Sequence, residues 1–346
     1  MIVVLQDEAR PVPAPSTGTP TGDEAEAPLD LLILGAGWTA GFLISCVEER
    51  KEPFRYRTTT TSGGGRWGSL KFKFDPTKQG DPESNQFESL PDTRAILVSF
   101  PITHPGGSAF LLDSYLRTRH AHFFHSVPFL DVLQLGSSGI FDGGPTLRAE
   151  ADSKELQQKQ MGWIDRHSPY DQENPRASSE DELLGMNGRV GREGSHLRLR
   201  TTVLNLSGLW GGARSIRNYV GKVAPTKEAL RAKTSVHMIH GLDVARAVLA
   251  VLAQFQAAAG QRWILTDMRV YDWWDLAAAW GQAGLANPEP HAPVGPQALW
   301  VSQLLDELHV QALPRSPSEL GRAIDSREFW RTFNLSPIRA RLEHFA

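Results

Sequence analysis

Short apolar runs alternate with helical patterns from Leu29 onward, and this alternation sets the expected fold. Apolar or β-branched runs predict strands at residues 29–34, 54–61, 71–75, 95–101, 131–135, 202–206 and 262–266. Helical spacing predicts helices over residues 42–50, 108–119, 178–186 and 242–258. Because strands that alternate with helices pair in parallel through right-handed crossovers, we expect an α/β fold with a doubly wound parallel Rossmann sheet.

The two ends of the chain depart from this alternation. Residues 1–28 are rich in Pro, Thr and acidic residues and predict a disordered tail, without the composition of a transit or signal peptide. Beyond residue 267 the pattern becomes helical and predicts a smaller, mostly helical C-terminal substrate cap. The tryptophans expected in that cap are Trp273, Trp274, Trp280, Trp300 and Trp330. We expect residues 29–210 and 235–266 to form the Rossmann domain, and residues 211–234 and 267–346 to form the cap.

Composition narrows the classes of partner. The 346 residues carry 36 Lys and Arg against 39 Asp and Glu, a net charge of −3, which does not favour nucleic acid or an anionic membrane as a partner. The single cysteine, Cys46, excludes an intramolecular disulfide and is expected to be a small core residue. No apolar run reaches the ~18 residues of a membrane span. We expect a cytoplasmic protein.

A glycine-rich segment between the first strand and the first helix is the strongest local signal. Its residues Gly35, Gly37 and Ala40 match the Gly-x-Gly-x-x-Gly/Ala pattern of dinucleotide-binding turns. Gly35 would permit the tight turn, and Gly37 would let a pyrophosphate approach the backbone. Trp38 and Thr39 complete the predicted cofactor site at the start of the helix. The alternative is a glycine-rich turn without a ligand.

The second strand bears on the choice between NAD and NADP. An acidic residue at its end would bind the ribose hydroxyls of NAD, whereas an arginine tolerates the additional phosphate of NADP. Residues 55–61 contain Arg57 and no acid, and Arg66 follows three consecutive glycines. This pattern favours NADP(H), with NAD(H) as the alternative cofactor; the arginines could equally be solvated surface residues.

Further motifs, in their order and spacing, resemble the extended and atypical short-chain dehydrogenases, the superfamily of nucleotide-sugar epimerases and dehydratases. The resemblance covers most of residues 29–337. It rests on the segments 74–76 (FDP), 98–101 (VSFP), 135–141 (LGSSGIF), 163–177 (WIDRHSPYDQENPRA), 205–214 (NLSGLWGGAR) and 238–245 (MIHGLDVA). The resemblance implies that Asp75 and Ser99 contact the cofactor and that Ser137 is catalytic. It also implies a substrate site that contains Ser138, Trp210, Arg214 and His240.

One departure from this family concerns its catalytic Tyr-x-x-x-Lys pair. None of the five tyrosines has a lysine four residues later, and the helix expected over residues 178–186 contains neither residue type. Ser137 could still donate a hydrogen bond to a substrate oxygen, or it could only cap the end of its strand. His167 and Tyr170 are alternative proton donors, although either could be a structural loop residue.

The histidines do not predict a metal centre. His120, His122 and His125 are not spaced to share one helical face, and we expect them in a loop without metal.

Two functions stay open. The first is an NAD(P)-binding oxidoreductase or epimerase-like enzyme that acts on a small polar carbonyl or alcohol with a non-standard acid/base. Such an enzyme could form a homodimer. The second is a non-catalytic NAD(P)-binding sensor or regulator, since a fold does not fix a function.

Overall fold

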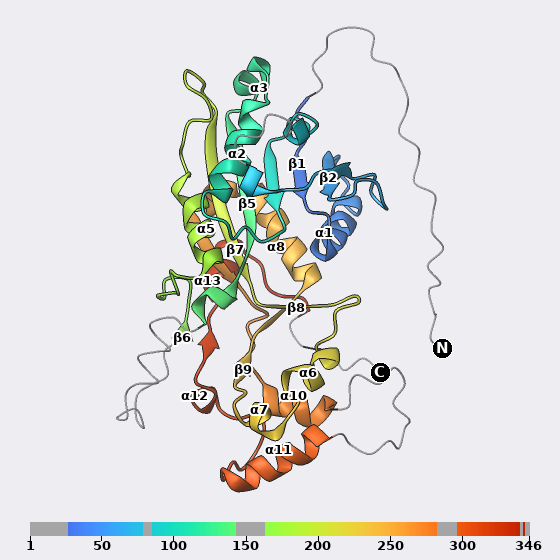
Figure 1. Ribbon diagram of the computed structural model, residues 1–346, viewed down its shortest axis with the longest axis vertical. Helices are drawn as coiled ribbons and strands as arrows, with labels where there is room; N and C mark the ends of the chain where they lie inside the picture. The colour runs from blue at the N-terminus through green and yellow to red at the C-terminus, as the bar shows by residue number, and fades with distance from the viewer. Residues whose placement is uncertain (1–26, 79–84, 143–162, 282–295, 340–341, 343–346) are drawn as a thin grey trace.

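A seven-stranded parallel sheet organises the protein. The computed structural model describes residues 27–78, 85–142, 163–281, 296–339 and 342. The sheet has the order β11-β7-β5-β4-β1-β2-β3 (Figure 1). Its strands are β1 Leu31–Leu34, β2 Tyr56–Thr60, β3 Leu70–Lys71, β4 Ala95–Val98, β5 Phe129–Ser137, β7 Arg198–Leu206 and β11 Gln261–Leu265. Each of the seven predicted strands overlaps a strand of this sheet, although β3 shares only Lys71 with the predicted range 71–75, and the doubly wound α/β fold is confirmed.

Helices cover both faces of the sheet, because its central strands are buried on both sides. One face packs against α1 Trp38–Glu48, α8 Gly241–Ala253, α9 Phe255–Ala258 and α13 Arg327–Thr332. The other packs against α2 Gly107–Arg117, α3 Ala121–Ser126 and α5 Pro175–Gly185. Alternate residues of β1 enter the two cores: Leu31 and Ile33 lie in the first, Leu32 and Leu34 in the second.

A smaller part lies beyond the carboxyl edge of the sheet, in the lower half of Figure 1. Its helices are α6 Val220–Val223, α7 Lys227–Arg231, α10 Trp273–Trp280, α11 Pro296–Glu307 and α12 Pro317–Leu320. Its main apolar cluster includes Trp210, Trp274 and Trp280. Short strand pairs border it: β8 Gly208–Trp210 with β10 Met238–His240, β9 Ser235–Val236 with β12 Tyr271–Asp272, and β6 Trp163–Ile164 with β13 Ala323–Ile324.

Short 3₁₀ turns complete the described structure. They are η1 Pro76–Lys78, η2 Asn85–Phe87, η3 Ser138–Phe141 and η5 Ile216–Tyr219.

Several sequence expectations need correction. Trp330 does not join the smaller part, because α13 returns to the sheet and packs its aromatic side chains against Trp263 of β11. The histidine segment is not a loop: α3 spans Ala121–Ser126, since Phe123 and Phe124 are buried on one side of it. The first helix begins at Trp38 rather than at residue 42, and the helix expected over 242–258 breaks into α8 and α9.

The described residues bear only partly on two other expectations, the disordered tail and the absence of a membrane span. The tail predicted over residues 1–28 lies almost entirely outside the described residues. Among the residues that are described, no helix is both long and apolar enough to span a membrane.

Candidate functional site

The turn after β1 contains two glycines, Gly35 and Gly37, with different local surroundings. Gly35 has φ +89°, and its amide donates to Thr59 Oγ1 at 3.0 Å. A Cβ on Gly35 would lie 2.8 Å from Ser99 Oγ, so no larger residue fits without movement. The Ser99 hydroxyl bonds to the carbonyls of Leu34 and Gly35. Ser99 therefore stabilises the turn, and its hydroxyl hydrogen is used in these backbone contacts.

The start of α1 is open. Gly37 is its N-cap residue, is exposed, and has no atom within 4 Å of the position of a Cβ. No side chain caps the helix, and its first turn contains no acidic residue. Thr39 and Ala40 are buried, so they anchor the helix against the sheet. The first amides of α1 and the positive end of its dipole thus face outward from the β1–β4 boundary, where the strand order reverses.

Trp38 connects this turn to the segment after β8. Its Nε1 donates to the carbonyl oxygen of Gly211 at 3.1 Å. The Arg214 guanidinium carbon lies 4.6 Å from the centroid of the Trp38 ring, and Phe42 packs edge-on at 4.9 Å. A residue predicted for the cofactor and one predicted for the substrate are therefore in direct contact.

His240 and Trp210 extend the same cluster. Their rings meet edge-on with centroids 4.6 Å apart, and Phe42 meets His240 at 5.3 Å. His240 is the N-cap of α8, and its Nδ1 accepts from the amide of Leu242 at 3.0 Å. A Cβ on Gly211 would lie 2.2 Å from His240 Nε2, so the glycine permits this packing. Three of the four predicted substrate residues lie in this cluster, beside α1.

Ser137 and Ser138 lie at the carboxyl end of β5, apart from that cluster. Ser137 is partly exposed, and its hydroxyl accepts from the amide of Gly139 at 3.1 Å. The hydroxyl can still donate its own hydrogen to another acceptor. Ser138 is buried and begins η3. Ser137 can therefore cap the end of its strand and still donate a hydrogen bond to a substrate oxygen.

A buried polar network below Ser137 was missed by the sequence analysis. Glu180 of α5 is fully buried, and its carboxylate accepts from Asn205 Nδ2 at 3.0 and 2.9 Å and from Arg262 Nε at 3.1 Å. Burial raises the pKa of Glu180. Arg262 and Asn205 act in the opposite direction, because they stabilise the charged carboxylate. Asn205 also donates to the carbonyl of Ser137 at 3.2 Å. The available sequence signal was an amide, Asn205, and a glycine, Gly136, near the carboxyl ends of two predicted strands.

The two substitute proton donors are held by other groups. The Tyr170 hydroxyl donates to Asp181 at 2.7 Å, and its ring lies 4.3 Å from the Arg262 guanidinium carbon. Burial and the bond to Asp181 raise the pKa of Tyr170. His167 is largely exposed and bonds to Glu328 at 2.9 Å. Neither interaction directs these side chains to Ser137.

The remaining residues predicted to bind the cofactor lie at different distances from the carboxyl edge of the sheet. Arg57 is exposed inside β2, three residues before the strand ends. Arg66 lies after that end, in a loop where Gly63, Gly64 and Gly65 all have positive φ. Asp75 follows β3, where its carboxylate accepts from the amide and hydroxyl of Thr77. Arg66 is therefore the arginine closer to the carboxyl edge of the sheet.

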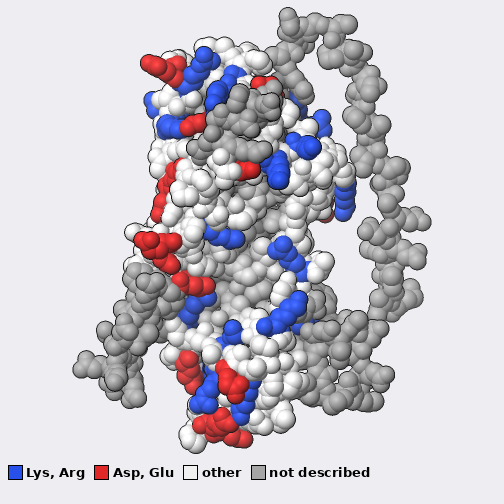
Figure 2. Space-filling view, in the orientation of Figure 1, with Lys and Arg blue, Asp and Glu red and all other residues white. Residues whose placement is uncertain are grey.

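Basic side chains border the middle of the molecule. Figure 2 shows Lys and Arg side chains between the sheet-containing part and the smaller part. Within the described residues, no group of three or more His, Cys, Asp or Glu is arranged to hold a metal ion.

Solved structures share this architecture, whereas no family model and no curated protein matches the chain. The chain is similar to yeast methylglyoxal/isovaleraldehyde reductase Gre2 complexed with NADPH, with 14% identity, a TM-score of 0.53, and 89% of this chain and 94% of that chain covered. It is similar to UDP-N-acetylglucosamine 4-epimerase from Bacillus cereus, with 10% identity, a TM-score of 0.51, and coverage of 89% and 94%. It is also similar to a Methylobacillus flagellatus protein classed with the NAD-dependent epimerases/dehydratases, with 14% identity and a TM-score of 0.52. That match covers 91% of this chain and 95% of the other. The chain has the fold of these proteins.

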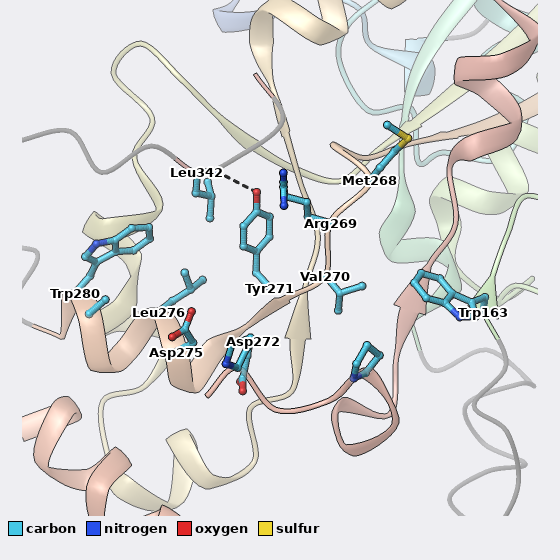
Figure 3. A pocket seen from close by; sticks show the side chains of 13 residues that line it. Trp163, Met268, Arg269, Val270, Tyr271, Asp272, Asp275, Leu276, Trp280 and Leu342 are labelled. Carbon is cyan, nitrogen blue, oxygen red and sulfur yellow. Dashed lines mark hydrogen bonds between the residues drawn. The ribbon is translucent and has the colours of Figure 1, made fainter. Parts of the chain in front are cut away.

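A separate pocket of about 510 Å³ lies beside α10 (Figure 3). Tyr271 stands between Leu342 and Arg269, with Trp280 on one side and Trp163 on the other. None of the site residues predicted from the sequence lines this pocket. Asp267, a hydrogen-bond partner of the pocket-lining Tyr271, accepts from the Tyr271 hydroxyl at 2.6 Å, and burial raises the pKa of Asp267 to about 7.

A second buried ionisable group, His237, is held neutral. Its Nε2 accepts from the amide of Ile324 at 3.0 Å, and burial lowers the pKa of His237 to about 3.

Proposed function

We propose that the chain binds a nicotinamide dinucleotide along the carboxyl edge of its sheet, with the pyrophosphate at the start of α1. The observation that carries this proposal is the open helix end behind Gly37, where no side chain caps the first amides. The turn fits the group: Gly35 leaves no space for a Cβ, and Gly37 leaves the approach free. Solved structures of the same fold include complexes with NADPH and with NAD.

We propose NADP(H) as the preferred cofactor and NAD(H) as the alternative. The loop after β2 supports this preference, because Arg66 follows glycines with positive φ and residues 61–69 contain no acid. Consecutive amides in such a loop can bind an anion such as the 2′-phosphate of NADP.

We further propose that the protein is an oxidoreductase or epimerase-like enzyme acting on a small polar carbonyl or alcohol. The bound cofactor supplies hydride chemistry. Ser137 donates a hydrogen bond to the reacting oxygen, from a backbone position held by Asn205. The proton donor differs from the family's Tyr-Lys pair, because α5 contains neither residue type.

Calorimetry with NADPH and NADH tests the binding site. Gly37→Asp fits the open space, and an acidic N-cap favours the helix, so the variant should fold and melt no lower than wild type. Its carboxylate should nevertheless abolish NADPH binding by repelling the pyrophosphate. Gly37→Asn has nearly the same size without the charge and should bind more tightly than Gly37→Asp. Equal affinity of wild type and Gly37→Asp would remove the pyrophosphate from this turn.

A non-catalytic sensor is the second candidate function. It is favoured by the engagement of Tyr170 with Asp181 and of His167 with Glu328, which leaves neither donor directed at Ser137. A sensor binds NADPH but oxidises none of it with ketones, aldehydes or nucleotide sugars. Stopped-flow absorbance of NADPH distinguishes the two functions.

A further inference from the structure

The tight turn Gly211–Arg214 lies against the first turn of α1. The amide of Gly211 donates to the carbonyl of Arg214 at 2.8 Å, and the amide of Arg214 donates back at 3.1 Å. Trp38 Nε1 holds this turn through the carbonyl of Gly211. A Cβ on Gly212 would lie 3.6 Å from Phe42 and 3.9 Å from Trp38 Nε1. The backbone after β8 is therefore fixed beside the helix end assigned to the pyrophosphate.

Arg214 brings a full positive charge to the same place. Its side chain is exposed, and its guanidinium carbon lies 4.6 Å from the centroid of the Trp38 ring. In the described part of the chain, no carboxylate forms an ion pair with it. Trp38 is the first residue of α1, so the guanidinium stacks on a side chain of the helix end whose first amides have no side-chain cap. Both favour an anion, and no acidic residue in the first turn of α1 neutralises them.

We propose that Arg214 binds the pyrophosphate of the cofactor and that the turn Gly211–Arg214 covers the bound phosphates. This assigns Arg214 to the cofactor instead of the substrate, and it rests on the proposed function. A helix end supplies the equivalent of about half a positive charge, whereas a pyrophosphate carries two negative charges. The planar guanidinium adds a full charge and two parallel N–H groups that match phosphate oxygens.

The contacts of Arg214 favour the cofactor over a substrate phosphate as the source of this anion. Its ring partner, Trp38, belongs to the cofactor turn itself, and the carbonyl of Gly211 is bonded to the same indole. Ser137, the residue assigned to the reacting oxygen, lies on β5, which β4 separates from β1 in the sheet. Arg214 therefore lies next to α1 and away from the strand that carries Ser137.

Calorimetry with three ligands tests the assignment in the full chain. NADPH and ADP-ribose contain the pyrophosphate, whereas adenosine 2′-monophosphate lacks it. Arg214→Gln should weaken NADPH and ADP-ribose binding by about 10- to 100-fold, the range for a lost charge-assisted contact. Binding of adenosine 2′-monophosphate should change by less than about twofold. Arg217→Gln is the matched control, because Arg217 stacks on Trp280 at 5.2 Å and should leave all three affinities unchanged.

The outcomes separate this proposal from the proposed function. If wild type binds ADP-ribose and Arg214→Gln binds it equally well, the guanidinium does not touch the pyrophosphate and the proposal is overturned. A second result would also overturn it. If NADPH-saturated wild type binds inorganic pyrophosphate and NADPH-saturated Arg214→Gln does not, Arg214 serves a substrate phosphate. If wild type binds neither NADPH nor ADP-ribose, the cofactor assignment itself fails, and this proposal fails with it.

Discussion

Asn205 on β7 donates through one amide nitrogen to both carboxylate oxygens of Glu180 on α5, at 3.0 and 2.9 Å, and to the carbonyl of Ser137 at 3.2 Å. The end of β5 is therefore fixed by side chains from a neighbouring strand and a covering helix. The position of Ser137 depends on residues far from it in the sequence.

Replacing Gly136 by Ala should disturb this network strongly. A Cβ there would lie 2.3 Å from Glu180 Oε1 and 2.5 Å from Asn205 Nδ2, closer than packed atoms allow. We expect a loss of about 1–3 kcal/mol in the free energy of unfolding, measured by urea denaturation. Gly185→Ala is the control, since a Cβ at the end of α5 meets nothing within 4 Å. A Gly136→Ala variant as stable as Gly185→Ala would contradict the packing described.

Removing the charge of Glu180 should cost more stability than removing that of Asp181. Both carboxylates bond to Arg262, but the Glu180 side chain is fully buried and that of Asp181 is 41% exposed. Glu180→Gln leaves a buried guanidinium without its nearest buried partner, which should cost about 3 kcal/mol. Asp181→Asn should cost less than about 1 kcal/mol. Urea denaturation of both variants measures the difference, and equal losses would refute the role given to burial.

Ser137→Ala should lower turnover by about 10- to 1,000-fold if the protein is an enzyme, because a donor to the developing oxyanion is lost. NADPH affinity should change little, since the proposed pyrophosphate site lies at α1. Ser178→Ala serves as the control and should keep full turnover, because Ser178 is exposed on α5 and belongs to no predicted site. Stopped-flow NADPH oxidation gives the rates. Full activity of Ser137→Ala would assign the oxygen to another donor.

Asp267 should make stability fall as pH rises from about 5 to about 7. Burial raises the pKa of Asp267 to about 7 from an ordinary value of 3.8, against the lowering effect of Tyr271 and Arg269. In this range the folded carboxyl keeps a proton that the unfolded one has released, so higher pH favours unfolding. Asp267→Asn removes this dependence.

Between pH 5 and pH 8, wild type should lose on the order of 2 kcal/mol relative to Asp267→Asn in urea denaturation. Groups that titrate alike in both proteins cancel in this comparison, including His237. Parallel stability curves across that range would show that Asp267 is already ionised at pH 5.

The fold was predictable because each strand of the sheet is a local pattern. Leu31–Leu34 and Ala95–Val98 are continuous apolar runs, as expected of central parallel strands buried on both faces. The glycine turn was predictable for a similar reason, since Gly35 and Gly37 lie between a strand and a helix. The limits of the elements were less accurate, because tertiary contacts decide where α8 ends and α9 begins.

The connections within the site were not predictable from local pattern. Glu180 appears in a polar helical segment that reads as a solvated face, yet it is fully buried because Arg262, on a strand 82 residues away, pairs with it. The contact between Trp38 and Gly211 joins residues 173 positions apart. The sequence does not separate Arg57 from Arg66 as the arginine at the end of β2, because composition alone cannot place that end to within a few residues.

The bond between Trp38 and Gly211 also has a consequence for biosynthesis. The glycine turn leaves the ribosome early, but the segment that covers it follows 173 residues later, and His240 later still. A ligand held by both segments cannot be gripped fully by a nascent or truncated chain. If the proposed dinucleotide site is correct, the ligand stabilises only the finished fold and would selectively protect completed molecules from proteolysis.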